Sequence, residues 1–377
     1  METTDLKAEF VRKYGRPPRV FRAPGRVNLI GEHTDYNDGF VMPCAIDFAT
    51  RVAAAERSDR RIRLASLNFP GEFEFDLDEP AIETAASWAR YVEGVAALLE
   101  RAGHRLKGAD LLIESSVPIG AGLSSSAALE VATGFAFASL AGLALEKWEL
   151  AKNGQRAEHE YAGVRSGIMD QFASAFGVEN HALFLDCRSL DWKPIPLRNA
   201  EFIICNTRTK HDLADGEYNQ RRADCEEAAR ILGRKSLRDV CLAELEFRAG
   251  ELSDRLLRRA RHVVTENDRV LAAVKALNEG RLDEFGRLMD ASHESLRADY
   301  EVSSAELDLM VEIVRGQPGV LGARMTGGGF GGCTVNLLER EASADFIENV
   351  SAAYRERTGI VPEIYVCRAA RGVSEIE

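Results

Sequence analysis

The sequence predicts an α+β protein with two domains, on three observations. A chain of 377 residues is long enough for two separate hydrophobic cores. Its apolar content of 45% and charged content of 29% are those of ordinary globular proteins. Strand-like and helix-like segments are partly segregated along the chain, which favours α+β over a doubly wound sheet. We expect the boundary within residues 182–206, which divides the chain into domains of residues 1–190 and 191–377.

The N-terminal half opens with a helix and continues as strands. Residues 5–14 have amphipathic helical spacing that ends at Gly15. Short runs of apolar and β-branched residues then alternate with turn-forming Asn-Asp-Gly and Ser-Asp, which predicts strands. A helix is expected at residues 88–102. The predicted strands cover residues 20–21, 27–30, 40–46, 52–55, 62–65, 72–75 and 109–115.

The remainder of the chain is mainly helical before it returns to strands. Residues 125–140 are apolar on nearly every face, so they predict a buried helix. Helices near residues 146–161 and 168–176 follow, and Gly177 ends the second of them. The other predicted elements are strands within residues 182–206, long helices over 217–232 and 253–315, and strands over 323–326, 333–338 and 363–366.

Composition excludes several classes of function. A net charge of −12 provides no positive field to attract nucleic acid or an anionic membrane. The first 18 residues lack the apolar core of a signal peptide, and no apolar run is long enough to predict a membrane span. Seven dispersed cysteines without a C-x-x-C pair indicate reduced thiols rather than a zinc or redox site. We expect a cytoplasmic protein with small-molecule partners, and we expect it to be a monomer.

Residues 117–128, with the sequence VPIGAGLSSSAA, predict a phosphate-binding loop. Glycines allow positive φ and a close approach to a ligand, and the helix start behind them presents unpaired N–H groups. The positive end of the helix dipole adds to this anion site. No Walker A pattern is present, which argues against the usual P-loop fold. The alternative is a glycine turn with a serine N-cap before a buried helix.

A dense polar cluster follows the apolar residues 27–30. Glu32, His33 and Asp35 combine acceptors with an imidazole that can donate or accept, a set suited to sugar hydroxyls. Arg26 supplies a rigid fork of donors that matches a phosphoryl group. The alternative for a single acidic residue here is a solvated polar turn.

Asp170 lies among apolar residues at a predicted helix start. The helix dipole would keep this carboxylate ionised, and an anionic carboxylate beside a bound hydroxyl can act as a general base. The alternative is an acid that only caps the helix.

Five glycines occupy residues 327–332, after a short predicted strand. Glycine destabilises both helix and sheet, so this run favours a close approach of the backbone to a ligand or to another loop. A wide hairpin turn is the alternative.

Taken in chain order, these four segments resemble the GHMP kinase superfamily, and residues 31–36 (GEHTDY) resemble the signature of its galactokinase family. Residues 123–127, 167–171 and 326–332 are also similar to galactokinases. The resemblance implies an N-terminal domain like that of ribosomal protein S5, with a rare left-handed β-α-β crossover. It also implies a ferredoxin-like C-terminal domain and an active site between the two.

The resemblance further implies phosphorylation of the anomeric hydroxyl of galactose by ATP, with Mg²⁺. It makes Asp170 and Arg26 catalytic, with Arg26 beside both Asp170 and the γ-phosphate. The residues it implies for the sugar are Glu32, His33, Thr34, Asp35, Tyr218, Gly328 and Gly329. Those it implies for ATP are Ser66, Gly120, Ala121, Gly122, Leu123, Ser124, Ser125 and Ser126, and those for Mg²⁺ are Ser126 and Glu158.

Two positions and two further functions stay open at this stage. Arg165 differs from the smaller or apolar residue of many relatives, and it either adds positive charge near the phosphates or points to solvent. Trp88 is a candidate neighbour of the adenine. The alternative functions are a kinase for N-acetylgalactosamine or L-arabinose, and a non-catalytic sugar sensor. Loss of Asp170, Arg26 or the serine loop would favour a sensor, and all of them are present.

Overall fold

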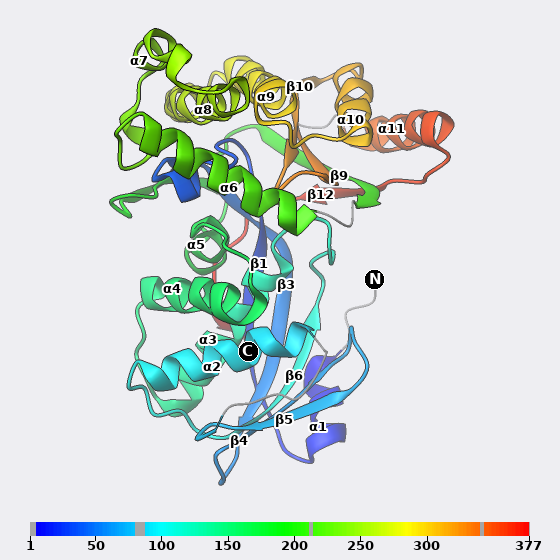
Figure 1. The fold of residues 1–377 in the computed structure, drawn as a ribbon. Coiled ribbons are helices and arrows are strands. Elements are labelled where there is room, and N and C mark those ends of the chain that lie inside the picture. The colour runs from blue at the N-terminus through cyan, green and yellow to red at the C-terminus, as the bar shows by residue number, and fades with distance from the viewer. Residues whose placement is uncertain (1–4, 80–86, 211–213, 340–342, 377) are drawn as a thin grey trace.

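A computed structural model describes residues 5–79, 87–210, 214–339 and 343–376, and three sheets organise them (Figure 1). The largest sheet has six strands in the order β13-β1-β3-β6-β4-β5. Only β4 and β6 pair in parallel, and the other neighbours are antiparallel. The strands are β1 (Arg19–Asn28), β3 (Pro43–Glu56), β4 (Arg61–Ser66), β5 (Glu72–Asp76), β6 (Ala109–Ser115) and β13 (Ser374–Ile376).

Helices cover both faces of this sheet. Alternate residues of β3 lie in different clusters, since Val52 packs with the larger helical layer and Ala53 packs with α1. The helix α3 is the central member of the larger layer and is buried along most of its length, as its apolar sequence predicts. The helices are α1 (Leu6–Tyr14), α2 (Ser87–Arg101), α3 (Ser125–Ala141), α4 (Lys147–Ala157) and α5 (Met169–Phe176).

Two smaller sheets complete the strands of the described residues. The first has the order β2-β7-β8, and the second has the order β10-β11-β9-β12. In Figure 1 the four-stranded sheet and its helices occupy the upper part of the molecule, above the six-stranded sheet. The strands are β2 (Phe40–Val41), β7 (His181–Asp186), β8 (Trp192–Pro196), β9 (Ala200–Lys210), β10 (Val320–Thr326), β11 (Gly331–Glu339) and β12 (Glu363–Cys367).

The upper part of the molecule carries the remaining helices. The longer helices are α6 (Ala214–Ile231), α7 (Leu242–Phe247), α8 (Asp254–Asn278), α9 (Leu282–Ser295), α10 (Ala305–Arg315) and α11 (Ser343–Thr358). The π-helical turns are η2 (Glu158–Ala162) and η5 (Leu296–Tyr300), and the 3₁₀ turns are η1 (Asp35–Asn37), η3 (Leu237–Asp239) and η4 (Ala249–Glu251).

One hydrophobic cluster joins the upper and lower parts. It contains Val27 of β1 and Leu29 just after that strand, together with Leu123 from the serine-rich loop (residues 117–126). Ile204 and Val335 join it from the four-stranded sheet. The loop and the strand end that carry the predicted site are therefore fixed by packing against both parts.

Most of the predicted helices and strands are confirmed, and the differences have local causes. Residues 20–21 and 27–30 were expected to form two strands, but β1 is continuous because a register shift between Pro24 and Arg26 absorbs the irregularity. The helical stretch 253–315 is three helices, and Gly280, with φ +72°, stands between the first two. The helices α7 and α11 and the strand β13 were not predicted.

The predicted boundary at residue 190 falls in the turn between β7 and β8, which pair with each other. The strand β13 returns from the end of the described chain to pair with β1.

In the part of the chain that the structure describes, no helix combines the length and the apolarity needed to cross a bilayer.

Helix α9 lies directly against β10 because two glycines meet there. A Cβ atom on Gly286 would come within 2.0 Å of the carbonyl oxygen of Leu321. A Cβ atom on Gly322 would come within 2.3 Å of the carbonyl oxygen of Gly286. Any side chain at either position would force the helix away from the sheet.

We therefore predict that Gly286→Ala destabilises the protein by about 1–3 kcal/mol, the usual cost of overpacking. Urea unfolding measures the effect. Gly250→Ala is the matched control, since a Cβ atom there has no other atom within 4 Å. Equal unfolding midpoints for the two variants would contradict the tight contact.

Candidate active site

Arg26 and Asp170 form a two-pronged ion pair between the first strand and α5. The Nε of Arg26 donates to Oδ1 of Asp170 at 2.8 Å, and Nη2 donates to Oδ2 at 2.8 Å. Nη1 donates to the carbonyl oxygen of Gly122 at 2.7 Å. Burial alone would lower the pKa of Arg26, but the carboxylates of Asp170 and Glu32 outweigh it and raise that pKa. The guanidinium is thus a permanent cation with a fixed orientation.

The bulge in β1 explains how Arg26 reaches the loop. A Cβ atom on Gly25 would lie 2.7 Å from the carbonyl oxygen of Leu123, so only glycine lets the strand pass this close. The backbone N–H of Arg26 then donates to that same oxygen at 3.1 Å. Asp170 meets Arg26 from the first turn of α5.

A small cavity of about 140 Å³ adjoins the ion pair. It gathers carboxylates, an imidazole, a phenol and glycine backbone from segments far apart in the sequence. Its lining comprises Arg26, Glu32, His33, Asp35, Glu158, Val164, Ser166, Met169, Asp170, Tyr218, Gly327 and Gly328.

Glu32 is held by the glycine-rich loop between β10 and β11. Its Oε1 accepts the backbone N–H of Gly327 at 2.8 Å and the hydroxyl of Thr326 at 3.2 Å. The guanidinium of Arg324, which is fully buried, lies 3.4 Å from the same oxygen. The loop therefore connects two strands as a hairpin turn and also forms a wall of the cavity. The glycine run thus combines the hairpin turn with the close backbone approach.

Asp35 has an unusually close neighbour in Gly167. A Cβ atom on Gly167 would overlap the Asp35 carboxylate at 1.8 Å, so glycine is required there. Burial, assisted by the negative charge of Asp170, raises the pKa of Asp35 to about 7. The carboxyl therefore changes its charge near neutral pH.

The serine-rich loop faces a second, larger cavity of about 640 Å³. Gly120, Ser125 and Ser126 line it at the N-terminus of α3. Ser124 adopts φ +58° and makes no N-cap hydrogen bond, because its hydroxyl donates to Oδ2 of Asp170 instead. The simple capping interpretation is therefore wrong for this serine. The side chains of Ala121 and Leu123 are buried in the core.

Glu158 lies at the wall common to both cavities. Its Oε1 accepts the hydroxyl of Ser126 at 3.1 Å, and its Oε2 accepts the hydroxyl of Ser166 and, at 3.2 Å, the amide of Gln171. Burial raises the pKa of Glu158 above its ordinary value. No group of three or more His, Cys, Asp or Glu side chains within the described ranges could hold a metal ion.

Aromatic side chains form the outer wall of the larger cavity. Trp88 lies there together with Phe69, Tyr91 and Ser66. The rings of Phe69 and Trp88 are stacked, with centroids 6.2 Å apart. Trp88 and Ser66 are thus brought to the same cavity as the serine loop.

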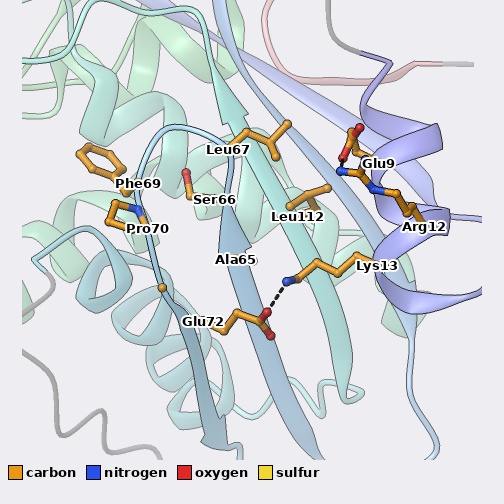
Figure 2. Close-up of a pocket in the computed structure, with 11 residues that line it drawn as sticks. Glu9, Arg12, Lys13, Ala65, Ser66, Leu67, Phe69, Pro70, Glu72 and Leu112 are labelled. Atoms are coloured by element: carbon orange, nitrogen blue, oxygen red, sulfur yellow. Dashed lines mark hydrogen bonds and ion pairs between the residues drawn. The ribbon is translucent and has the colours of Figure 1, made fainter.

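A third hollow, of about 490 Å³, opens on the other side of the loop that carries Phe69 (Figure 2). It is surrounded by Leu67, Leu112 and, from α1, Lys13. Two residues, Ser66 and Phe69, line both this hollow and the larger cavity. None of the predicted catalytic or sugar-binding residues lines it.

Besides residues 121–124 of the serine-rich loop, the predicted positions Thr34, Gly329 and Arg165 lie outside the linings of the two cavities. The Thr34 hydroxyl lies within hydrogen-bonding distance of the carbonyl oxygens of Gly31 and Phe40. Gly329 is closed in by Val302, whose carbonyl oxygen would lie 2.3 Å from a Cβ atom. The Arg165 side chain is 60% exposed and lies 3.8 Å from Glu226, away from both cavities.

Sequence reasoning missed Ser166, Phe69 and Tyr91 as wall residues. Ser166 had a signal, since it stands beside Arg165 in a segment already singled out. The aromatic residues had none, because their approach to the serine loop depends on how α2 and the β4–β5 connection pack.

The pKa of Asp35 leads to a prediction about stability. In the unfolded chain the carboxyl has a pKa near 3.8, whereas in the folded protein it is about 7. As pH rises from about 4 to about 7, only the unfolded state loses its proton, so the wild type loses stability relative to Asp35→Asn. The loss is at most about 4 kcal/mol, from ~1.4 kcal/mol per pH unit, and it is constant above pH 7. Urea titrations at several pH values measure it, and a difference independent of pH would contradict the prediction.

Comparisons with known proteins identify the family of this chain. A galactokinase galactose-binding signature matches residues 8–56, a GHMP kinase N-terminal domain matches residues 90–178, and a GHMP kinase C-terminal domain matches residues 273–356. The curated galactokinase of Chloroflexus aggregans is 50% identical over 380 residues, which cover 99% of this chain and 97% of that protein. The galactokinase of a Roseiflexus species is 47% identical over 383 residues, covering 100% and 98% of the two chains.

Solved structures extend the comparison to the fold. The crystal structure of Lactococcus lactis galactokinase complexed with galactose has a TM-score of 0.94 at 40% identity, over 98% of this chain and 99% of that one. The mevalonate kinase of Methanococcus jannaschii has a TM-score of 0.66 at 21% identity, over 94% and 99%, and shares the fold. The sequence identity over the full chain and the three matched signatures establish that this chain belongs to the galactokinase family of GHMP kinases.

Proposed function

We propose that this protein is an ATP-dependent galactokinase that phosphorylates the anomeric hydroxyl of α-D-galactose and releases ADP. The observation that carries the proposal is the Arg26–Asp170 ion pair. It borders a small cavity rich in sugar-type hydrogen-bonding groups, beside a larger cavity at a helix N-terminus. The small cavity receives the sugar, and the larger one receives the nucleotide, for which its volume is suitable.

Asp170 accepts the proton of the attacking hydroxyl. Its two oxygens already receive bonds from Arg26 and Ser124, but a carboxylate has about four acceptor sites, so one remains for the sugar. The Asp170 side chain is 23% exposed, which leaves it accessible from the cavity. Glu32, His33 and Tyr218 fix the sugar so that the hydroxyl oxygen faces the phosphorus.

Arg26 and the N-terminus of α3 balance the charge of the phosphoryl group. The transition state of phosphoryl transfer is loose, so positioning and charge stabilisation supply most of the rate enhancement. Gly120, Ser125 and Ser126 present backbone N–H groups and hydroxyls to the phosphates at the positive end of α3. These local features replace the positive surface that a net charge of −12 does not provide.

The residues at the wall between the cavities fit Mg²⁺. Ser126 and Glu158 offer oxygen ligands only 3.1 Å apart, and Mg²⁺ on substrate phosphates needs few protein ligands. When bound, the ion would neutralise charge on the β- and γ-phosphates.

We also propose that the protein is a cytoplasmic monomer. The cysteines support the compartment, because all seven lie in the described part of the chain and are free thiols.

A panel of sugars with a coupled ADP assay tests the proposed substrate. Galactose is expected to give the highest kcat/KM, because a site built to pair each hydroxyl rejects analogues that leave its groups unpaired. A higher kcat/KM for N-acetylgalactosamine or L-arabinose would show that this other sugar, and not galactose, is the preferred substrate. Sugar binding without any ADP release would indicate a sensor.

We predict that Asp170→Asn lowers kcat by about 10²–10⁴-fold, the usual contribution of a general base. Galactose binding, measured by calorimetry, is retained, because the sugar-holding groups remain. Normal ADP release from this variant would remove Asp170 from the mechanism.

We predict that Glu158→Ala raises the Mg²⁺ concentration needed for half-maximal rate. The matched control is Glu160→Ala on the same π-helical turn, where the carboxylate pairs with Arg101 and Arg156 instead. An unchanged Mg²⁺ titration in Glu158→Ala would count against its assignment as a ligand.

A further inference from the structure

His33 is the one imidazole in the lining of the small cavity, and only one of its ring nitrogens makes a hydrogen bond of good geometry in the described structure. The hydroxyl of Tyr36 lies 2.8 Å from Nδ1 of His33. The other nitrogen, Nε2, is buried and makes no hydrogen bond of good geometry, although the backbone of Gly328 lies near enough to the ring to favour its protonated form. Because the ring lines the cavity, Nε2 is the atom available to a sugar hydroxyl.

The His33 ring is neutral, and the backbone of this residue has an uncommon conformation. Burial, together with the nearby His262, Arg221 and Arg324, lowers the pKa of His33 well below its ordinary value. His33 has φ +62°, a region that side chains rarely adopt, and the side-chain amide of Asn37 donates to its carbonyl oxygen at 2.9 Å. A neutral imidazole has one donor and one acceptor nitrogen, so Nδ1 decides what Nε2 offers.

Tyr36 is itself the middle of a chain of hydrogen bonds that runs into the upper helices. Its hydroxyl lies 2.8 Å from the hydroxyl of Tyr300, which ends the π-helical turn η5. The Tyr300 hydroxyl lies 3.1 Å from Sγ of Cys225 on α6. Tyr300 is fully buried and Cys225 is 1% exposed, so water does not compete along this part of the chain.

Two arguments decide the direction of this chain. An imidazole nitrogen is a better acceptor than a phenol oxygen, and a thiol is weak in either role. The favourable order is therefore Cys225 to Tyr300, Tyr300 to Tyr36, and Tyr36 to Nδ1 of His33. This order leaves a proton on Nε2, and the cavity contains the carboxyl groups of Glu32, Asp35, Glu158 and Asp170, which favour a donor over a lone pair.

We propose that the chain Cys225–Tyr300–Tyr36 fixes His33 as the Nε2–H tautomer and so makes it a hydrogen-bond donor in the sugar cavity. Tyr300 and Cys225 are positioning residues that never touch the substrate. The sugar-binding consequence rests on the proposed function, whereas the tautomer is a property of the protein alone. Glu32 and Asp35 provide acceptors in the same cavity, so His33 supplies the complementary donor.

Nitrogen-15 NMR of the sugar-free protein, labelled at histidine, tests the tautomer directly. His262 is an internal reference, because its Nε2 lies 3.1 Å from the carbonyl oxygen of Glu32, which can only accept. We expect His33 to show the same Nε2–H pattern as His262. Tyr36→Phe should remove the preference, and Tyr300→Phe should weaken it. An Nδ1–H tautomer in the wild-type protein would overturn the proposal whether or not the protein phosphorylates galactose.

Steady-state kinetics tests the consequence for the sugar. Tyr300→Phe should raise the KM for galactose by about 2- to 10-fold, the scale of one hydrogen bond, with kcat nearly unchanged. The matched control is Tyr354→Phe, another fully buried tyrosine, whose hydroxyl donates to the carbonyl oxygen of Thr207 at 3.2 Å. Cys225→Ala should resemble Tyr300→Phe more weakly, and Cys225→Ser should restore the wild-type KM. If Tyr300→Phe and its control Tyr354→Phe have equal KM values for galactose and equal histidine spectra, Tyr300 has no positioning role.

Discussion

The ion pair between Arg26 and Asp170 is the interaction on which the rest of the site depends. It joins β1 to the serine-rich loop, 96 residues along the chain from Arg26 to Gly122, and to α5, 144 residues along from Arg26 to Asp170. The guanidinium of Arg26 is buried, and a buried charge without a partner costs several kcal/mol, so Asp170 stabilises Arg26 in this position. The bulge at Gly25 and the hydroxyl of Ser124 are adjustments of neighbouring segments to this pair. Stability and chemistry thus impose the same geometry.

The small cavity concentrates negative charge that the fold has to compensate. Glu32 is balanced by Arg324, by the backbone N–H of Gly327 and by the hydroxyl of Thr326. Asp35 and Glu158 instead have raised pKa values because burial dominates. Such a cluster lowers the stability of the empty protein and favours a ligand that brings hydroxyl donors or a cation. The donor tautomer proposed for His33 follows the same electrostatic logic. The acidity of the cavity therefore contributes to its selectivity.

The sequence predicted the segments of the site better than their contacts. Glycine runs, serine triplets and acidic residues after strands are local signals, so Asp170, Glu32 and the loop before α3 could be found from their own neighbours. The bond from Ser124 to Asp170 could not, because it depends on how α3 and α5 pack. The single long β1 was missed for a related reason: its bulge is stabilised by the loop at Leu123, far away in the sequence. Long-range packing decided each of these cases.

The pairing of β13 with β1 has a consequence for biosynthesis. Residues 374–376 cover the edge of β1 at residues 20–22, and Arg19 pairs with Glu375 at 2.7 Å. During translation, the nascent N-terminal half therefore leaves the ribosome with that edge open. An open strand edge can pair with another chain. Pairing between two strands this far apart in the sequence is slow, so the edge of β1 stays open for longer. A chain that lacks β13 would keep this edge of β1 unpaired, and such an exposed edge is a natural substrate for chaperones.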